Sequence, residues 1–116
     1  MSRTLCIQVH PNRAPDLDLA RLRSICDVLA NRKDLIAEFS VNEGRDKGPY
    51  INLMFETGNP EKLWRLLRTK LYRDEAVGAA LARASMAVIE GKQGWDDYYL
   101  LFHFDPDVAV EKLDSR

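Results

Sequence analysis

The sequence predicts an α+β fold, with one mainly antiparallel β-sheet and helices packed on one of its faces. Several segments alternate apolar and polar residues with a period of two, which is typical of strands buried on one side only. Between them lie segments whose leucines recur at helical spacing. With 116 residues, 46% of them hydrophobic and 30% charged, the chain is expected to form a single α+β domain over residues 1–116.

The first half of the chain is expected to contain a strand, a helix and two more strands. The first strand alternates strictly, and Pro11 ends it because proline cannot donate to a strand ladder. Either Asp16 or Asp18 can cap the helix that follows. A polar loop with two glycines joins the later strands. The expected bounds are residues 4–10, 35–41 and 50–57 for the strands and about 16–31 for the helix.

The second half carries the clearest local signal, Asn59-Pro60-Glu61. An asparagine cap, a proline at the first helical position and an early acid together indicate a helix start. Asp105-Pro106 repeats the cap and proline, and this predicts a short terminal helix. The elements expected after Asn59 are helical segments over 59–71 and 74–83, a hairpin of strands over 86–90 and 95–105, and the terminal helix over 107–113.

The resulting order, βαββα(α)ββ, resembles the ferredoxin-like sandwich in its architecture. The resemblance concerns the fold alone, because no stretch of the chain carries the motif of a known family. It implies a sheet that is covered by helices on one face and left bare on the other.

Charge is segregated along the chain although the net charge is only −1. The predicted second helix carries a row of cations, whereas residues 86–116 contain seven acids and three bases. We interpret the row as a solvated helix face, because no aromatic residues interleave outward with it, and nucleic acid is not an expected partner. The cations of the row are Lys62, Arg65, Arg68, Lys70 and Arg73.

No membrane, metal or cofactor is expected. No apolar run approaches the roughly 18 residues of a membrane span, and no signal peptide is visible, so the cytoplasm of a bacterial-type cell is the expected location by elimination. Cys6 and Cys26 are then expected to be reduced. His10 and His103 come from separate strands without a spacing that fixes metal ligands, and no phosphate-binding glycine loop occurs.

The bare face and the closing hairpin form the expected binding site. Alternation in the last strand is expected to turn Leu100 and Phe102 toward the core and Tyr99, Leu101 and His103 toward the bare face. A surface that mixes aromatic, apolar and polar side chains is typical of a protein interface. The expected partner-binding residues are Tyr50, Met54, Glu56, Trp95, Asp96, Asp97, Tyr99, Leu101 and His103.

Simpler interpretations of these residues stay open. The face is also compatible with an ordinary wet sheet surface or with a homodimer interface without a further role, and less so with a surface covered by the terminal helix. For Asp96 and Asp97, turn formation is a simpler interpretation than partner binding. Trp95 is expected either to pack on the turn or to anchor a partner.

These observations favour a non-enzymatic protein-binding module. It would self-associate, with a homodimer expected, or act as an immunity or antitoxin-type partner. The expected apolar anchors are Tyr99, Leu101, Tyr50 and Met54, and the expected steering charges are Asp96, Asp97 or Glu56. The alternative is a small-ligand-binding protein or a cofactor-free enzyme that uses His10 or His103. A weaker third interpretation is an RNA-binding sheet, which lacks the expected glycine-aromatic strand motif. The docking interpretation requires Tyr99 and Leu101 to lie outside the interior.

Overall fold

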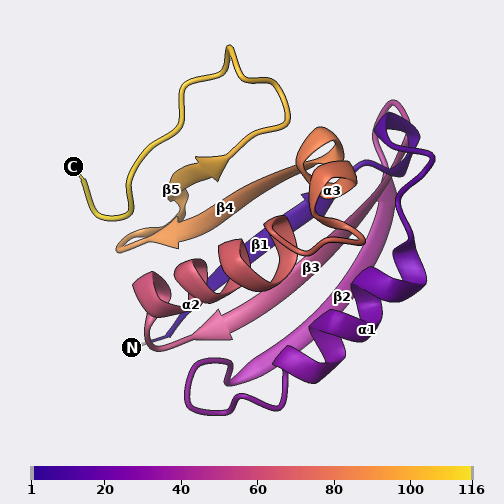
Figure 1. The fold of residues 1–116 in the computed structure, drawn as a ribbon. Helices are drawn as coiled ribbons and strands as arrows, with labels where there is room; N and C mark the ends of the chain where they lie inside the picture. The colour runs from indigo at the N-terminus through magenta and orange to yellow at the C-terminus, as the bar shows by residue number, and fades with distance from the viewer. Residues whose placement is uncertain (1, 116) are drawn as a thin grey trace.

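In the computed structural model, which describes residues 2–115, the chain forms an α+β fold with one five-stranded antiparallel sheet and three α-helices (Figure 1). The sheet order is β2-β3-β1-β4-β5, and every neighbouring pair is antiparallel. The predicted α+β class is therefore confirmed. The strands are β1 (Arg3–Val9), β2 (Glu38–Arg45), β3 (Pro49–Thr57), β4 (Ser85–Gly91) and β5 (Gly94–Phe102).

The helices begin where side chains satisfy their first free N–H groups. Asp18, rather than Asp16, caps α1 (Leu19–Leu29), and its Oδ1 accepts a 2.9 Å hydrogen bond from the N–H of Arg21. Asn59 caps α2 (Pro60–Leu67) in the predicted way, with Pro60 at the first position. A π-helical turn over Arg68–Tyr72 extends α2, and α3 (Gly78–Ala84) follows.

The helices cover one face of the sheet and form the core against it (Figure 1). Strand residues that alternate with outward-facing neighbours supply the sheet side, as Leu5, Ile7 and Phe55 do. Leu63 and Leu67 of α2 pack onto them and are fully buried. Each such side chain contributes roughly 1.5–3 kcal/mol relative to exposure, so this layer holds the fold together.

The second strand begins three residues later than predicted. Leu35 and Ile36 are both buried, although strand neighbours should point to opposite faces. They belong to a turn in which both of their N–H groups donate to the carbonyl oxygen of Arg32. The apparent alternation from Leu35 was therefore a misleading signal, because two consecutive core residues in a turn imitate the start of a strand.

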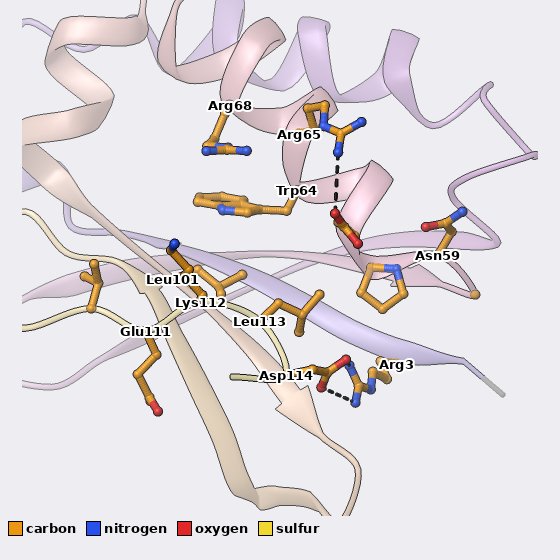
Figure 2. A pocket seen from close by; sticks show the side chains of 14 residues that line it. Arg3, Asn59, Trp64, Arg65, Arg68, Leu101, Glu111, Lys112, Leu113 and Asp114 are labelled. Carbon is orange, nitrogen blue, oxygen red and sulfur yellow. Dashed lines mark hydrogen bonds and ion pairs between the residues drawn. The ribbon is translucent and has the colours of Figure 1, made fainter. Parts of the chain in front are cut away.

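The predicted terminal helix over 107–113 is not formed. The Asp105 carboxylate accepts a hydrogen bond from the N–H of Asp107, and the carbonyl oxygen of Asp105 accepts one from Val108, but only this single turn results. Farther along, the N–H of Glu111 donates to the carbonyl oxygen of Leu100 in β5 at 2.8 Å. Residues 103–115, which we call the C-terminal tail, thus follow an irregular path beside β5 and α2 (Figures 1 and 2).

Candidate functional site

The sheet face turned away from the helices, which we call the bare face, carries one row of side chains across all five strands. The register places Met54 between Ser40 and Cys6, and Val88 between Cys6 and Leu100. Their strand neighbours belong to the core, so these side chains point away from the helices. We call Ser40, Met54, Cys6, Val88 and Leu100 the central row.

Cys6 lies at the middle of the central row and is only 6% exposed. Burial raises the pKa of its thiol to about 12, so the group stays protonated at neutral pH and is a poor nucleophile. Cys26 lies on the inner side of α1 and is buried in the core on the opposite side of the sheet. Both thiols are free. Cys6 therefore acts as a small apolar centre of the bare face rather than as a reactive group.

A ladder of amides borders the central row toward the C-terminal end of β1. Gln8 Nε2 donates to Asn52 Oδ1 at 2.9 Å, and Asn52 Nδ2 donates to Asn42 Oδ1 at 2.9 Å. The three residues are cross-strand neighbours on β1, β3 and β2. The ladder fixes the amide orientations and lines up polar groups along one border.

Acidic residues border the central row on its other side. Glu38 and Glu56 stand directly opposite each other on β2 and β3, an arrangement of like charges that is unfavourable on an isolated sheet. Ser2 Oγ donates to Glu56 at 2.8 Å, and the backbone N–H of Thr4 donates to Glu90 at 2.6 Å. This border therefore favours a partner that brings hydrogen-bond donors or positive charge.

Three of the predicted binding residues lie on the bare face as expected. Tyr50, Met54 and Glu56 alternate along β3 with the core residues Leu53 and Phe55. Tyr50 lies so close to Gly44 on β2 that a Cβ at Gly44 would fall 2.2 Å from the phenol oxygen. The aromatic ring thus covers the glycine and stiffens this corner.

Tyr99 and Leu101 were predicted on the bare face, and this placement is wrong. They are 4% and 7% exposed and belong to the core on the helix side. Val88 pairs with Leu100 and Ala87 with Phe102, so Leu101 is an extra, bulged residue in β5. Phe102 also lies on the helix side, with its ring 4.6 Å from that of Tyr72. The face assignment of the strand is therefore reversed at Tyr99, and docking with Tyr99 and Leu101 as anchors is ruled out. Leu100 takes the place on the bare face, so any docking through this face has to use a different set of side chains.

The first part of β5 departs even more from a regular pair. Gly91 pairs with Gly94 and Ile89 with Tyr99, so the four residues 95–98 stand opposite Glu90 alone. The carbonyl oxygen of Asp97 approaches Gly91, which a larger residue would prevent. Trp95 is exposed. The irregular pairing agrees with a turn role for Asp96 and Asp97, and binding by these three residues stays a prediction.

The two histidines, which come from distant parts of the chain, meet around one aromatic ring. The Phe104 ring centroid lies 5.8 Å from that of His10 and 4.2 Å from that of His103, and the Arg13 guanidinium stacks on Phe104 at 3.7 Å. Burial lowers the pKa of His10, and nearby Arg13 and His103 lower it further. His103 Nδ1 accepts from the N–H of Asp105. His103 thus joins this cluster at the sheet end, where its role as a binding residue stays a prediction.

On the helix side, the irregular tail leaves a cavity of about 960 Å³ between itself and α2 (Figure 2). Trp64, Leu101 and Leu113 contribute apolar surface, and Arg68 and Lys112 contribute charge. Sequence reasoning missed this cavity because it expected a helix in the tail. It also missed Cys6, Val88 and Leu100 as a continuous row, because cross-strand register is not visible in the sequence.

Within residues 2–115, His, Cys, Asp and Glu side chains form no group of three that could hold a metal ion. No helix of this described part is long and apolar enough to cross a membrane. The chain matches no known family model, and neither curated proteins nor solved structures give a significant match.

Proposed function

We propose that the chain is a ferredoxin-like, non-enzymatic protein-binding module that pairs through its bare face with a second copy of itself. The observation that carries this proposal is the central row, in which Met54, Val88 and Leu100 extend apolar surface from β3 to β5 without a helix above it. The element order βαββα, followed by a hairpin, supports the ferredoxin-like assignment. We keep the cytoplasm as the proposed location.

The polar borders of the face support a self-complementary pairing. A two-fold axis parallel to the central row turns one copy over, so the acidic border of each copy lies above the amide ladder of the other. Glu38 and Glu56 then meet the N–H groups of Asn42, Asn52 and Gln8 instead of meeting other carboxylates. An axis parallel to the strands would oppose acid with acid, so the first arrangement is favoured.

The size of the face indicates a weak, reversible dimer. Five strands spaced by about 4.8 Å, with five to six residues of about 3.3 Å each, give a projected area on the order of 400–500 Å². Stable complexes bury about 800 Å² on each partner. We therefore expect association to depend on concentration in the micromolar to millimolar range.

Sedimentation velocity over concentrations of about 5 μM to about 1 mM tests the proposal. We expect the weight-average mass to rise from monomer toward dimer. Val88→Glu should abolish the rise, because it places a charge at the centre of the interface without touching the core. Val28→Glu is the matched control, since Val28 is 65% exposed on α1, on the other side of the sheet.

Two results would overturn this proposal. The first is a wild-type chain that stays monomeric at the highest concentration. The second is a dimer that Val28→Glu disrupts as strongly as Val88→Glu, which would place the interface on the helices. Circular dichroism must show that both variants are folded, because only then does the comparison report on the surface.

An immunity or antitoxin-type role, in which the same face blocks the surface of a different protein, is the heterologous form of this proposal. The like charges of Glu38 and Glu56 favour a basic partner surface in that case. A catalytic role has less geometric support, because the histidines are grouped with Phe104 and Arg13 rather than with a nucleophile or carboxylate pair.

A further inference from the structure

The cavity between α2 and the C-terminal tail is lined by a few apolar side chains, by four cations and by three carboxylates, which belong to Glu61, Glu111 and Asp114. Its volume of about 960 Å³ lies at the upper end of the roughly 300–1,000 Å³ that small-molecule sites occupy. Trp64, Leu101 and Leu113 line it, and the lining residue Val110 is 54% exposed. The tail therefore leaves apolar surface uncovered in a recess that is large enough for a ligand.

Two of the four cations that line the cavity are already paired. Arg3 makes a two-pronged ion pair with Asp114, at 2.8 and 3.2 Å, and this pair ties the tail to the start of β1. Arg65 lies 3.5 Å from Glu61 within α2. Both pairs are drawn as dashed lines in Figure 2.

The other two cations have no carboxylate partner among the described residues. Arg68 lies over the indole of Trp64, with its guanidinium carbon 5.7 Å from the ring centroid, and makes no ion pair within residues 2–115. Lys112 lines the same cavity as Trp64, Leu101 and Leu113, and Figure 2 draws it across the indole from Arg68. A cavity in which one cation lies over an aromatic ring and a second cation belongs to the lining provides apolar contact and anion attraction at one place.

We propose that this cavity binds a small amphipathic carboxylate, a class of ligand that pairs one anionic group with a hydrocarbon chain. The carboxylate lies at the edge of the indole between Arg68 and Lys112, and the hydrocarbon lies against Trp64, Leu101 and Leu113. A ligand in this position covers the exposed Val110 and completes the partial packing of the tail. The site is on the helix side of the sheet and is independent of the proposed dimer face.

Intrinsic fluorescence offers a direct test, because Trp64 lines the cavity and Trp95, the other tryptophan, lies in the hairpin. In a Trp95→Phe background, titration with decanoate should change the Trp64 emission in a saturable way. Decanol, which has the same chain without the charge, should bind at least about tenfold more weakly, as expected for the loss of a charge-assisted hydrogen bond.

Substitutions locate the anionic group. Arg68→Gln should raise the dissociation constant of decanoate roughly tenfold, and Lys112→Gln should weaken binding in the same direction. Arg73→Gln should leave the constant unchanged, because Arg73 is an exposed cation just after α2 that does not line the cavity. All three positions are on the surface, so the fold is expected to tolerate each change.

Three results would overturn the proposal: no saturable change up to about 1 mM decanoate, equal binding of decanol and decanoate, or equal weakening by Arg73→Gln and Arg68→Gln. Val88→Glu separates this site from the dimer. The variant should keep full decanoate affinity even where it abolishes self-association, so either proposal can fail alone.

Discussion

The close approach of the hairpin backbone to Gly91 predicts that Gly91→Ala destabilises the fold. A Cβ at this position would lie 1.9 Å from the carbonyl oxygen of Asp97 and 2.8 Å from its carbonyl carbon. These atoms belong to the backbone, so the irregular segment of β5 has to move as a unit. Overpacking of this kind costs about 1–3 kcal/mol.

The net effect follows from two opposing contributions. Replacing glycine by alanine restricts the unfolded chain and favours folding by about 0.4–1 kcal/mol. Because the added Cβ would meet backbone at 1.9 Å, the overpacking cost lies in the upper part of its range, at about 2–3 kcal/mol. We therefore expect a net loss of about 1–2.5 kcal/mol in the free energy of unfolding for Gly91→Ala. Gly58→Ala is the matched control, because no atom lies within 4 Å of the added Cβ and the backbone is not left-handed there.

Urea unfolding followed by circular dichroism measures the difference. With a slope of about 1–3 kcal/mol per molar urea, a loss of about 1.5 kcal/mol moves the midpoint down by about 0.5–1.5 M. Gly58→Ala should leave the midpoint unchanged or raise it slightly. Equal midpoints for Gly91→Ala and the wild type would show that the hairpin moves at no cost, and would refute the reasoning.

Three further outcomes are expected. The hydrogen bonds from Arg3 lower the pKa of Asp114, so the tie that holds the tail is present above the ordinary pKa of aspartate and is lost as pH falls through the lowered value. The protection of tail amides, taken relative to their intrinsic exchange rates at each pH, should therefore fall in acid, and Asp114→Asn should lose this protection at neutral pH as well. The pKa of His10 is lowered mainly by burial, so its neutral form favours the fold above about pH 6.5 and protonation weakens the fold below it; His10→Asn should reduce the drop in melting temperature between about pH 7.5 and about pH 5.5. Burial raises the pKa of Cys6 to about 12, so iodoacetamide should modify this thiol only after unfolding, and rapid labelling of the native chain would contradict the structure.

Much of the fold was predictable because strand alternation and helix caps, which are local signals, agree with the tertiary packing in β1, β3, α1 and α2. Strict alternation in β1 and β3 identified both strands and their inner faces, including Leu5, Ile7 and Phe55. Caps are local hydrogen-bonding devices, so the sequence predicted the start of α2 at Asn59 and narrowed the cap of α1 to Asp16 or Asp18, of which the structure shows Asp18.

The candidate site was less predictable, because it depends on pairing between distant segments. The alternation of β5 continues through Leu101 in the sequence, but one extra residue at the bulge reverses the faces, and no residue type marks it. The cavity depends on the C-terminal tail, in which Asp105 and Pro106 suggested a helix. Instead of forming a helix, the tail bonds to β5 through the N–H of Glu111 and the carbonyl oxygen of Leu100. Placing the residues of such a site requires the register and not only the composition.

The irregular β5 also bears on how the sheet avoids uncontrolled growth. An edge strand with free backbone groups invites end-to-end stacking into fibrils. Here the distorted Trp95–Tyr98 stretch lacks the flat geometry that another strand would need. The carbonyl oxygen of Leu100 already accepts a hydrogen bond from the N–H of Glu111. At the opposite edge, β2 carries the charged residues Glu43 and Arg45, which discourage such stacking. Assembly of this chain is thereby directed away from the open edges, toward forms that stop at a finite size.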